Sequence, residues 1–210
     1  MAKKSYNKNK KLTFALLCLS LLSIPFASVQ ATEKTEDVVY LLPNANGALN
    51  QWNIFPATVS ARDNIELLMH WDKVDDPIER PDEDRTYVYT NGMFKIEDFN
   101  HETSDLLEGV TITNVRVVAR MKSTGVYNAI VNIGLKLNGI RFPARNNEML
   151  TANYANYCED WAYNPLSLTP DTSWTKADID DLQTSLKSTS IPIGTMAYCT
   201  QIYLIVSYTS

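Results

Sequence analysis

Apolar and polar residues alternate with a period of two over much of the second half of the chain. Between Thr111 and Lys122 the apolar side chains fall mostly on one face, and residues 127–137 and 196–208 follow the same pattern. Such alternation is typical of strands with one buried face. We therefore expect three long antiparallel strands, and weaker patterns predict further strands at 38–42, 51–55, 66–71, 86–89, 93–96 and 154–161.

Two turn signals indicate how these strands pair. Ser123-Thr124-Gly125 separates the first two long strands, which are therefore expected to form a hairpin. Asn138-Gly139 predicts a second hairpin, because this dipeptide tolerates the positive φ angles of a type I′ turn.

One segment carries the signals of a helix. Thr175 followed three residues later by Asp178 matches a capping box, and Ile179, Leu182 and Leu186 then form an apolar stripe. We expect one short helix from about Thr175 to Leu186. Many short strands with a single helix predict an all-β antiparallel two-sheet sandwich.

The first 31 residues differ from the rest. They hold five lysines and no acid, a largely apolar run of about 13 residues, and the small-residue pattern Val29-Gln30-Ala31. This is the layout of a secretory signal peptide, and the run is shorter than the roughly 20 residues that span a bilayer as a helix. We expect 1–31 to be a signal peptide, 32–37 a polar lead and 38–210 one domain. An uncleaved anchor is the alternative.

Cleavage after Ala31 removes five lysines and no acid, so the net charge changes from −5 to −10. A chain this acidic lacks the clustered Lys and Arg that neutralise nucleic-acid phosphates. We expect no nucleic-acid partner and no membrane span after cleavage. The expected location is outside the cell or at its extracellular surface, with the periplasm as an alternative.

Cleavage also removes Cys18 and leaves Cys158 and Cys199. Two cysteines in an oxidising compartment predict one disulfide. Two unpaired buried thiols are the alternative.

Carboxylates are concentrated in one segment, which holds Asp72, Asp75, Asp76, Glu79, Asp82, Glu83 and Asp84. Calcium prefers six to eight oxygen ligands, so clustered acids could bind it. The spacing does not match an EF-hand, and a solvated loop is the alternative. If calcium is a cofactor, the candidate ligands are Asp72, Asp75, Asp76, Asp82, Glu83 and Asp84.

Aromatic residues give the best argument for binding. Four Trp and 11 Tyr supply flat faces that suit both sugars and protein interfaces, although sandwich cores use them too. Trp52 follows a polar stretch and is expected to be exposed. Trp71 adjoins a strand pattern and belongs either to the core or to a ligand surface.

Catalytic signals are sparse. Neither Ile112 to Met121 nor Tyr127 to Leu137 contains an acid, which leaves Glu159 and Asp160 as candidates for a glycan-directed hydrolase. The sequence has no Gly-x-Ser-x-Gly elbow, P-loop, dinucleotide or metalloprotease motif. We therefore expect a protein that is not an enzyme.

The apolar, β-prone segment from Val38 to Leu42 suggests self-assembly, because it could pair with the sheet edge of a neighbouring subunit. An ordinary first strand in its own sandwich is the alternative.

Several stretches resemble uncharacterised jelly-roll modules, lectin-like or galactose-binding-like, of exported archaeal and bacterial proteins and phage particles. The resemblance covers about 42–208 and is carried by 70–77, 81–89, 112–120, Asn164-Pro165, 174–179 and 199–203. It implies a jelly-roll sandwich and no particular activity or catalytic residue.

Together these patterns predict an exported, non-catalytic β-sandwich with a structural or adhesive role at a cell surface or in an extracellular or virion-like assembly. A carbohydrate-binding module, with or without calcium, is the first alternative. Surface glycans are then the partner, and a row of exposed aromatic residues on one sheet would favour this alternative.

Overall fold

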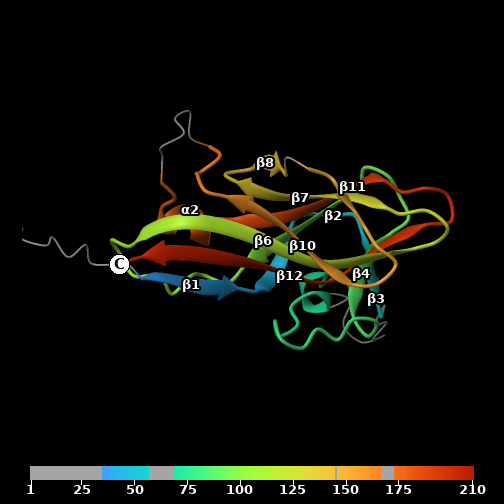
Figure 1. Cartoon of the computed structure of the whole chain (residues 1–210), viewed down its shortest axis with the longest axis horizontal. Coiled ribbons are helices and arrows are strands. Elements are labelled where there is room, and N and C mark those ends of the chain that lie inside the picture. The colour runs from blue at the N-terminus through green and yellow to red at the C-terminus, as the bar shows by residue number, and fades with distance from the viewer. Residues whose placement is uncertain (1–34, 57–68, 145, 167–172) are drawn as a thin grey trace, which may run out of the picture. The chain divides into compact units, whose positions relative to one another are not determined.

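The computed structural model describes residues 35–56, 69–144, 146–166 and 173–210 (Figure 1). The description below concerns the compact unit Lys34–Ser210. The expected signal peptide lies outside the described residues. Among the described residues, no helix is long and apolar enough to cross a membrane.

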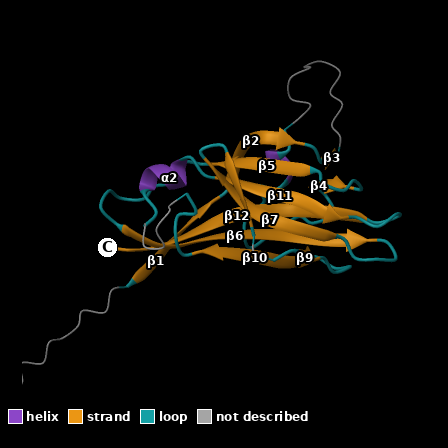
Figure 2. Ribbon diagram, turned by 90° about the horizontal axis from the view of Figure 1, so that it is seen from above, coloured by secondary structure: helices purple, strands orange, loops and turns teal. Residues whose placement is uncertain are grey.

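The described part of the chain forms two antiparallel sheets (Figure 2). The first, sheet A, has the order β10 (Ala155–Trp161), β6 (Thr111–Thr124), β12 (Met196–Thr209), β4 (Tyr87–Thr90) and β3 (Asn53–Phe55), and β1 (Glu36–Leu41) also pairs with β12. The second, sheet B, has the order β2 (Pro43–Asn50), β5 (Ile96–His101), β11 (Gln183–Ser190), β7 (Ile130–Leu137) and β8 (Ile140–Pro143), and β9 (Glu148–Met149) also pairs with β7. The predicted all-β two-sheet sandwich is confirmed.

The core lies between the two sheets and is built by the predicted alternation. On β6 and β7 alternate side chains are fully buried, among them Val115, Val117, Met121, Ile133 and Leu135. Opposite faces of these strands carry polar residues because successive side chains point to opposite sides.

The Asn138-Gly139 hairpin is confirmed, since it joins β7 to β8 with φ angles of 49° and 78°. The hairpin predicted across Ser123-Thr124-Gly125 is wrong, because β6 lies in sheet A and β7 in sheet B. The intervening loop crosses between the sheets. A Cβ at Gly125 would stand 2.5 Å from the Gly194 carbonyl oxygen, so only glycine fits this crossing.

The helix begins as predicted and ends early. Thr175 and Asp178 form the capping box of α2 (Lys176–Asp180), with the Asp178 backbone N–H donating to the Thr175 hydroxyl at 3.1 Å. Leu186 lies in β11 instead, so the prediction of a helix up to Leu186 is wrong. Its side chain is buried, as are those of Thr184 and Ser188, so alternate residues of this strand are buried. The apolar stripe of Ile179, Leu182 and Leu186 had favoured a helix over this strand pattern.

Two weaker predictions also failed. Residues 93–95 precede β5, where Phe94 has a φ of 60°, and Trp71 lies in the 3-10 helix η2 (Trp71–Lys73). Residues 66–68 lie outside the described residues. The strand β2 was missed because its sequence is polar and rich in Asn.

The predicted disulfide is wrong: both cysteines are free, Cys158 exposed and Cys199 buried. They lie on β10 and β12, which are separated by β6, so about 9.5 Å of sheet stands between the two strands. Cβ atoms of bridged cysteines lie roughly 4 Å apart. A register shift between Cys199 and Gln201 also turns Cys199 toward the core, while Cys158 points outward.

We expect the two thiols to react very differently. Burial raises the pKa of the Cys199 thiol far above its usual value, whereas Cys158 is exposed. Alkylation of the native protein followed by peptide mapping should modify Cys158 and leave Cys199 intact until the chain is unfolded. Recovery of a peptide in which the two are linked would contradict this fold.

His101 is a buried group whose neutral form holds β5 in place. Its Nδ1 lies 3.0 Å from the Leu41 carbonyl oxygen and its Nε2 lies 3.0 Å from the Thr184 hydroxyl. Burial lowers the pKa of His101 to about 4, because the charged ring would lose its hydration.

This shift predicts an acid-sensitive fold. Between pH 6.5 and 4 the unfolded chain binds a proton at His101 that the folded chain does not, so folding stability falls as the pH falls. Urea unfolding at both pH values should show a decrease of about 3 kcal/mol from this group. His101→Gln should have a smaller pH dependence, and an equal dependence in both proteins would refute the assignment.

Candidate functional site

Four aromatic side chains form a continuous cluster on the outer face of sheet A, which we call the aromatic platform. They are Phe55 from β3, Tyr87 and Tyr89 from β4, and Tyr198 from β12. The rings of Phe55 and Tyr87 are stacked at 4.8 Å, and those of Tyr89 and Tyr198 at 6.0 Å. Tyr87 meets the edge of Tyr198 at 5.2 Å and joins the two pairs.

Strand register explains why these rings meet. Phe55 is directly opposite Tyr87, and Tyr89 is directly opposite Tyr198. Facing aromatic side chains on neighbouring strands stabilise one another and so keep the cluster fixed. The rings remain half-buried or exposed, and Phe55 presents 43% of its surface.

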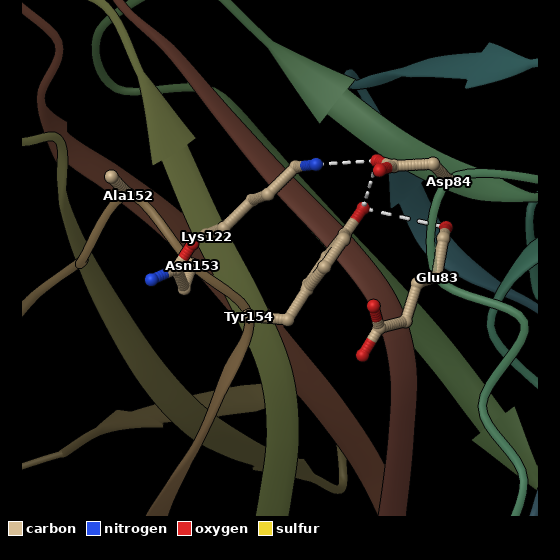
Figure 3. Close-up of a pocket in the computed structure, with 6 residues that line it drawn as sticks. All are labelled: Glu83, Asp84, Lys122, Ala152, Asn153 and Tyr154. Atoms are coloured by element: carbon tan, nitrogen blue, oxygen red, sulfur yellow. Dashed lines mark hydrogen bonds and ion pairs between the residues drawn. The ribbon is translucent and has the colours of Figure 1, made fainter.

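A polar hollow of about 300 Å³ adjoins the platform, lined by Glu83, Asp84, Lys122, Ala152, Asn153 and Tyr154 (Figure 3). Lys122 stands opposite Tyr198 in the sheet, with its ammonium 5.6 Å from the centre of that ring and 4.3 Å from the Tyr154 ring. The platform and the hollow therefore share Lys122 as their boundary.

The groups in the hollow are linked to one another. Lys122 forms an ion pair with Asp84, and the Tyr154 hydroxyl donates to Asp84 at 3.3 Å and approaches the Glu83 carbonyl at 3.4 Å (Figure 3). Beside them Arg120 forms an ion pair with Glu83. Two acids are thus balanced by two cations, which gives the hollow many hydrogen-bonding groups and little net charge.

The acidic segment is held against β12, and this fixes Asp84. The Thr200 hydroxyl lies 3.0 Å from both the Glu83 and the Thr86 carbonyl oxygens and shares its one proton between them. Gln201 donates to the carbonyls of Asp76 and Pro77, also at 3.0 Å. Thr200 lies at the register shift of β12, so the irregular point of the strand is where it anchors the loop.

Electrostatics favour a hydroxyl-bearing ligand that is neutral. Burial raises the pKa of the Tyr154 phenol well above its usual value, and the Asp84 carboxylate adds to the rise. Tyr154 therefore keeps its proton and can both donate and accept. Asp84 and Glu83 are each paired with a cation and add carboxylate oxygens that can accept hydrogen bonds.

The six candidate calcium ligands do not meet in one place. Among the described residues, no group of three or more His, Cys, Asp or Glu could hold a metal ion. Most of these acids have another partner, since Asp72 pairs with Lys73, Asp76 accepts from the Asp82 backbone at 2.6 Å and Asp82 accepts from Thr86. Burial, with the nearby Asp82, raises the pKa of Asp76 to about 6, and burial raises that of Asp75.

The structure places the two candidate tryptophans away from the platform. Trp52 was expected to be exposed, and this is wrong: only 3% of its surface is accessible, and its backbone N–H donates to Glu97 at 2.9 Å. Glu97 is fully buried beside His70. Trp71 is partly buried and packs against the core.

The candidate hydrolase acids also separate. Glu159 and Asp160 are successive residues of β10, so they point to opposite faces. Asp160 receives two hydrogen bonds from Arg116, at 2.7 and 3.1 Å, and these lower its pKa. An acid held in its ionised form is poorly suited to protonate a leaving group.

The segment from Val38 to Leu42 overlaps β1, which is paired with β12 of its own sheet over its whole length. Val39 and Leu41 point toward the core, and Val38 and Tyr40 lie on the exposed side. The segment is thus an ordinary strand of this sandwich, and its backbone groups facing β12 are occupied.

No family model and no curated protein sequence matches the chain. Several solved structures have a similar fold, and two of them are described here. A structure titled "CBM4 structure and function" is 11% identical and has a TM-score of 0.35, with 66% of this chain and 92% of that chain covered. The CBM22-1 xylan-binding domain of Xyn10C from Paenibacillus barcinonensis is 13% identical and has a TM-score of 0.40, with 82% and 96% covered. Because both structures are only distantly similar to this chain, the similarity concerns the arrangement of the strands alone.

Proposed function

We propose that the protein is a non-catalytic glycan-binding module that uses the outer face of sheet A. The observation that carries this proposal is the aromatic platform joined to a polar hollow of little net charge. Sugar rings present C–H faces, which pack on aromatic rings, and hydroxyl groups, which need paired donors and acceptors. The platform supplies the first kind of surface, and Lys122, Asp84 and Tyr154 supply the second.

The proposed ligand is a chain of sugars rather than one monosaccharide. Asn53, Tyr89, Tyr198 and Lys122 face one another on four neighbouring strands, so they form a row across the sheet. Three strand spacings make this row about 14 Å long. A neutral polysaccharide laid along it would contact aromatic faces first and then the hollow.

This function fits a protein that acts outside the cell. The basic leader and its apolar run are the features that favour export, and glycans are abundant on surfaces there. In this proposal the adhesive role comes from glycan binding, and no metal cofactor is needed.

Affinity electrophoresis against a panel of soluble polysaccharides tests the proposal. Neutral β-linked and α-linked glucans, xylan and mannan would be compared with charged polymers such as alginate. Retardation by at least one neutral polymer is expected, with little effect of EDTA. Migration unchanged by every polymer, or retardation by charged polymers alone, would overturn it.

A further inference from the structure

One end of the sandwich exposes large apolar side chains on three loops, which we call the apolar tip. The loop before β5 carries Met93 and Phe94, the β6–β7 loop carries Val126 and Tyr127, and the β11–β12 loop carries Ile193. Ile193 is as accessible as in an isolated peptide, and Val126 is 89% exposed. Figure 1 shows these loops extending from the end of the sandwich opposite the C-terminus.

These three loops lie together. Gly125 is packed against Gly194 and Thr195, and the Thr195 hydroxyl donates to the Tyr127 carbonyl at 3.1 Å. On the other side, the Phe94 backbone N–H donates to the Ser188 carbonyl at 2.7 Å, just before the β11–β12 loop.

The exposure of these side chains is built into the backbone. Phe94 has a φ of 60°, in the left-handed region that is costly for a bulky residue, and the residue is nevertheless 62% exposed. Gly194, with a φ of 76°, follows Ile193 directly. The backbone contacts fix the shape of these loops, and their largest apolar side chains point away from the core. Exposed apolar side chains gathered in one place are typical of an interaction surface.

Charge at the tip is unlike that of the whole chain. The stretches 85–96, 109–147 and 182–210, which include all three loops, contain no Asp or Glu, although the chain has 24 acids. Lysines are present, with Lys95 exposed and the ammonium of Lys187 5.9 Å from the Phe94 ring. Acids on packed elements are buried or lie beside other groups: Glu97 and Asp98 of β5 are fully buried, Glu148 pairs opposite Val131, and Asp84 is paired with Lys122.

We propose that the apolar tip docks onto a phospholipid bilayer. Phe94, Val126 and Ile193 enter the boundary between headgroups and acyl chains, while Tyr127 and the lysines stay at the headgroup level. Projecting single side chains on three loops suit a deformable lipid surface better than the flat, hydrogen-bonding surface of a protein partner. The absence of acids in these loops lets them approach anionic headgroups without repulsion. Sheet A is not required for this contact.

Vesicle flotation tests the inference with the purified protein and vesicles of phosphatidylcholine containing phosphatidylglycerol, without any glycolipid. The wild type is expected to float with the vesicles. Val126→Ser with Ile193→Ser should reduce the bound fraction at least about tenfold, since burying one such side chain is worth more than that. Neither side chain has a core contact to lose, and circular dichroism checks that the fold is kept.

Leu107→Ser is the matched control, because Leu107 is 73% exposed in the β5–β6 connection, away from the tip. It should float like the wild type. Two results would overturn the inference: a wild type that stays unbound, or a double variant that floats as well as the wild type. Sedimentation velocity is run in parallel, and a dimer lost in the double variant without any lipid binding would make the tip an interface between copies instead.

Discussion

Replacing Arg141 with alanine is expected to lower the free energy of unfolding by about 3 kcal/mol, because it strips a buried carboxylate of its main partner. Asp98 is fully buried on sheet B, and the Arg141 guanidinium donates to both of its oxygens at 2.9 and 2.7 Å. The same side chain donates to the Ser185 hydroxyl at 2.7 Å. Lys136, at 3.5 Å, is the cation that would remain.

Urea unfolding of three variants measures this. Arg141→Lys keeps a charge without the forked geometry and should lose less than the alanine variant. Asp98→Asn added to Arg141→Ala should recover part of the loss, since no buried carboxylate then lacks its guanidinium partner. If the alanine variant is as stable as the wild type, or if the second change costs further stability, Asp98 and Arg141 do not form the pair described.

Tyr198→Ala is expected to weaken glycan binding at least about tenfold, because it removes the ring that lies between the rest of the aromatic platform and Lys122. Tyr198 contacts Tyr87, Tyr89 and the Lys122 ammonium, so its loss leaves a gap in the row across the sheet. Titration calorimetry with a polysaccharide found by the screen measures the change.

Two controls make this result specific. Tyr198→Phe keeps the ring and loses only the hydroxyl, to which Thr124 donates at 3.3 Å, so it should bind nearly as well as the wild type. Tyr163→Ala removes an equally large side chain that is 56% exposed elsewhere, and it should have no effect. Equal losses in Tyr163→Ala and Tyr198→Ala would show that the platform is not the binding surface.

The sequence predicted the sandwich because alternation is a local property. The strands from Thr111 and Met196, the Asn138-Gly139 turn and the Thr175 cap all follow from residues close together in the chain. Which sheet a strand joins depends on contacts between distant residues, so the pairing across Gly125 was predicted wrongly. The helix was extended to Leu186 because leucines four apart fit a strand as well as a helix.

The candidate site was harder to predict, because it depends on strand register. Tyr87 and Tyr89 alternate visibly with Val88 and Thr90, but their outward face is known only once β4 is paired with β12. The shift at Thr200 reverses the face of Cys199, and no local signal marks it. Trp52 was predicted to be exposed because it follows a polar stretch, but its side chain belongs to the core.

Chemical-shift mapping of the isotopically labelled protein tests the glycan-binding account most directly. On titration with an oligosaccharide of the polymer selected by electrophoresis, the account predicts that perturbed amides cluster on β3, β4, the start of β12, Lys122 and 152–154. Perturbations confined to sheet B or to the apolar tip, or none at saturating ligand, would contradict it.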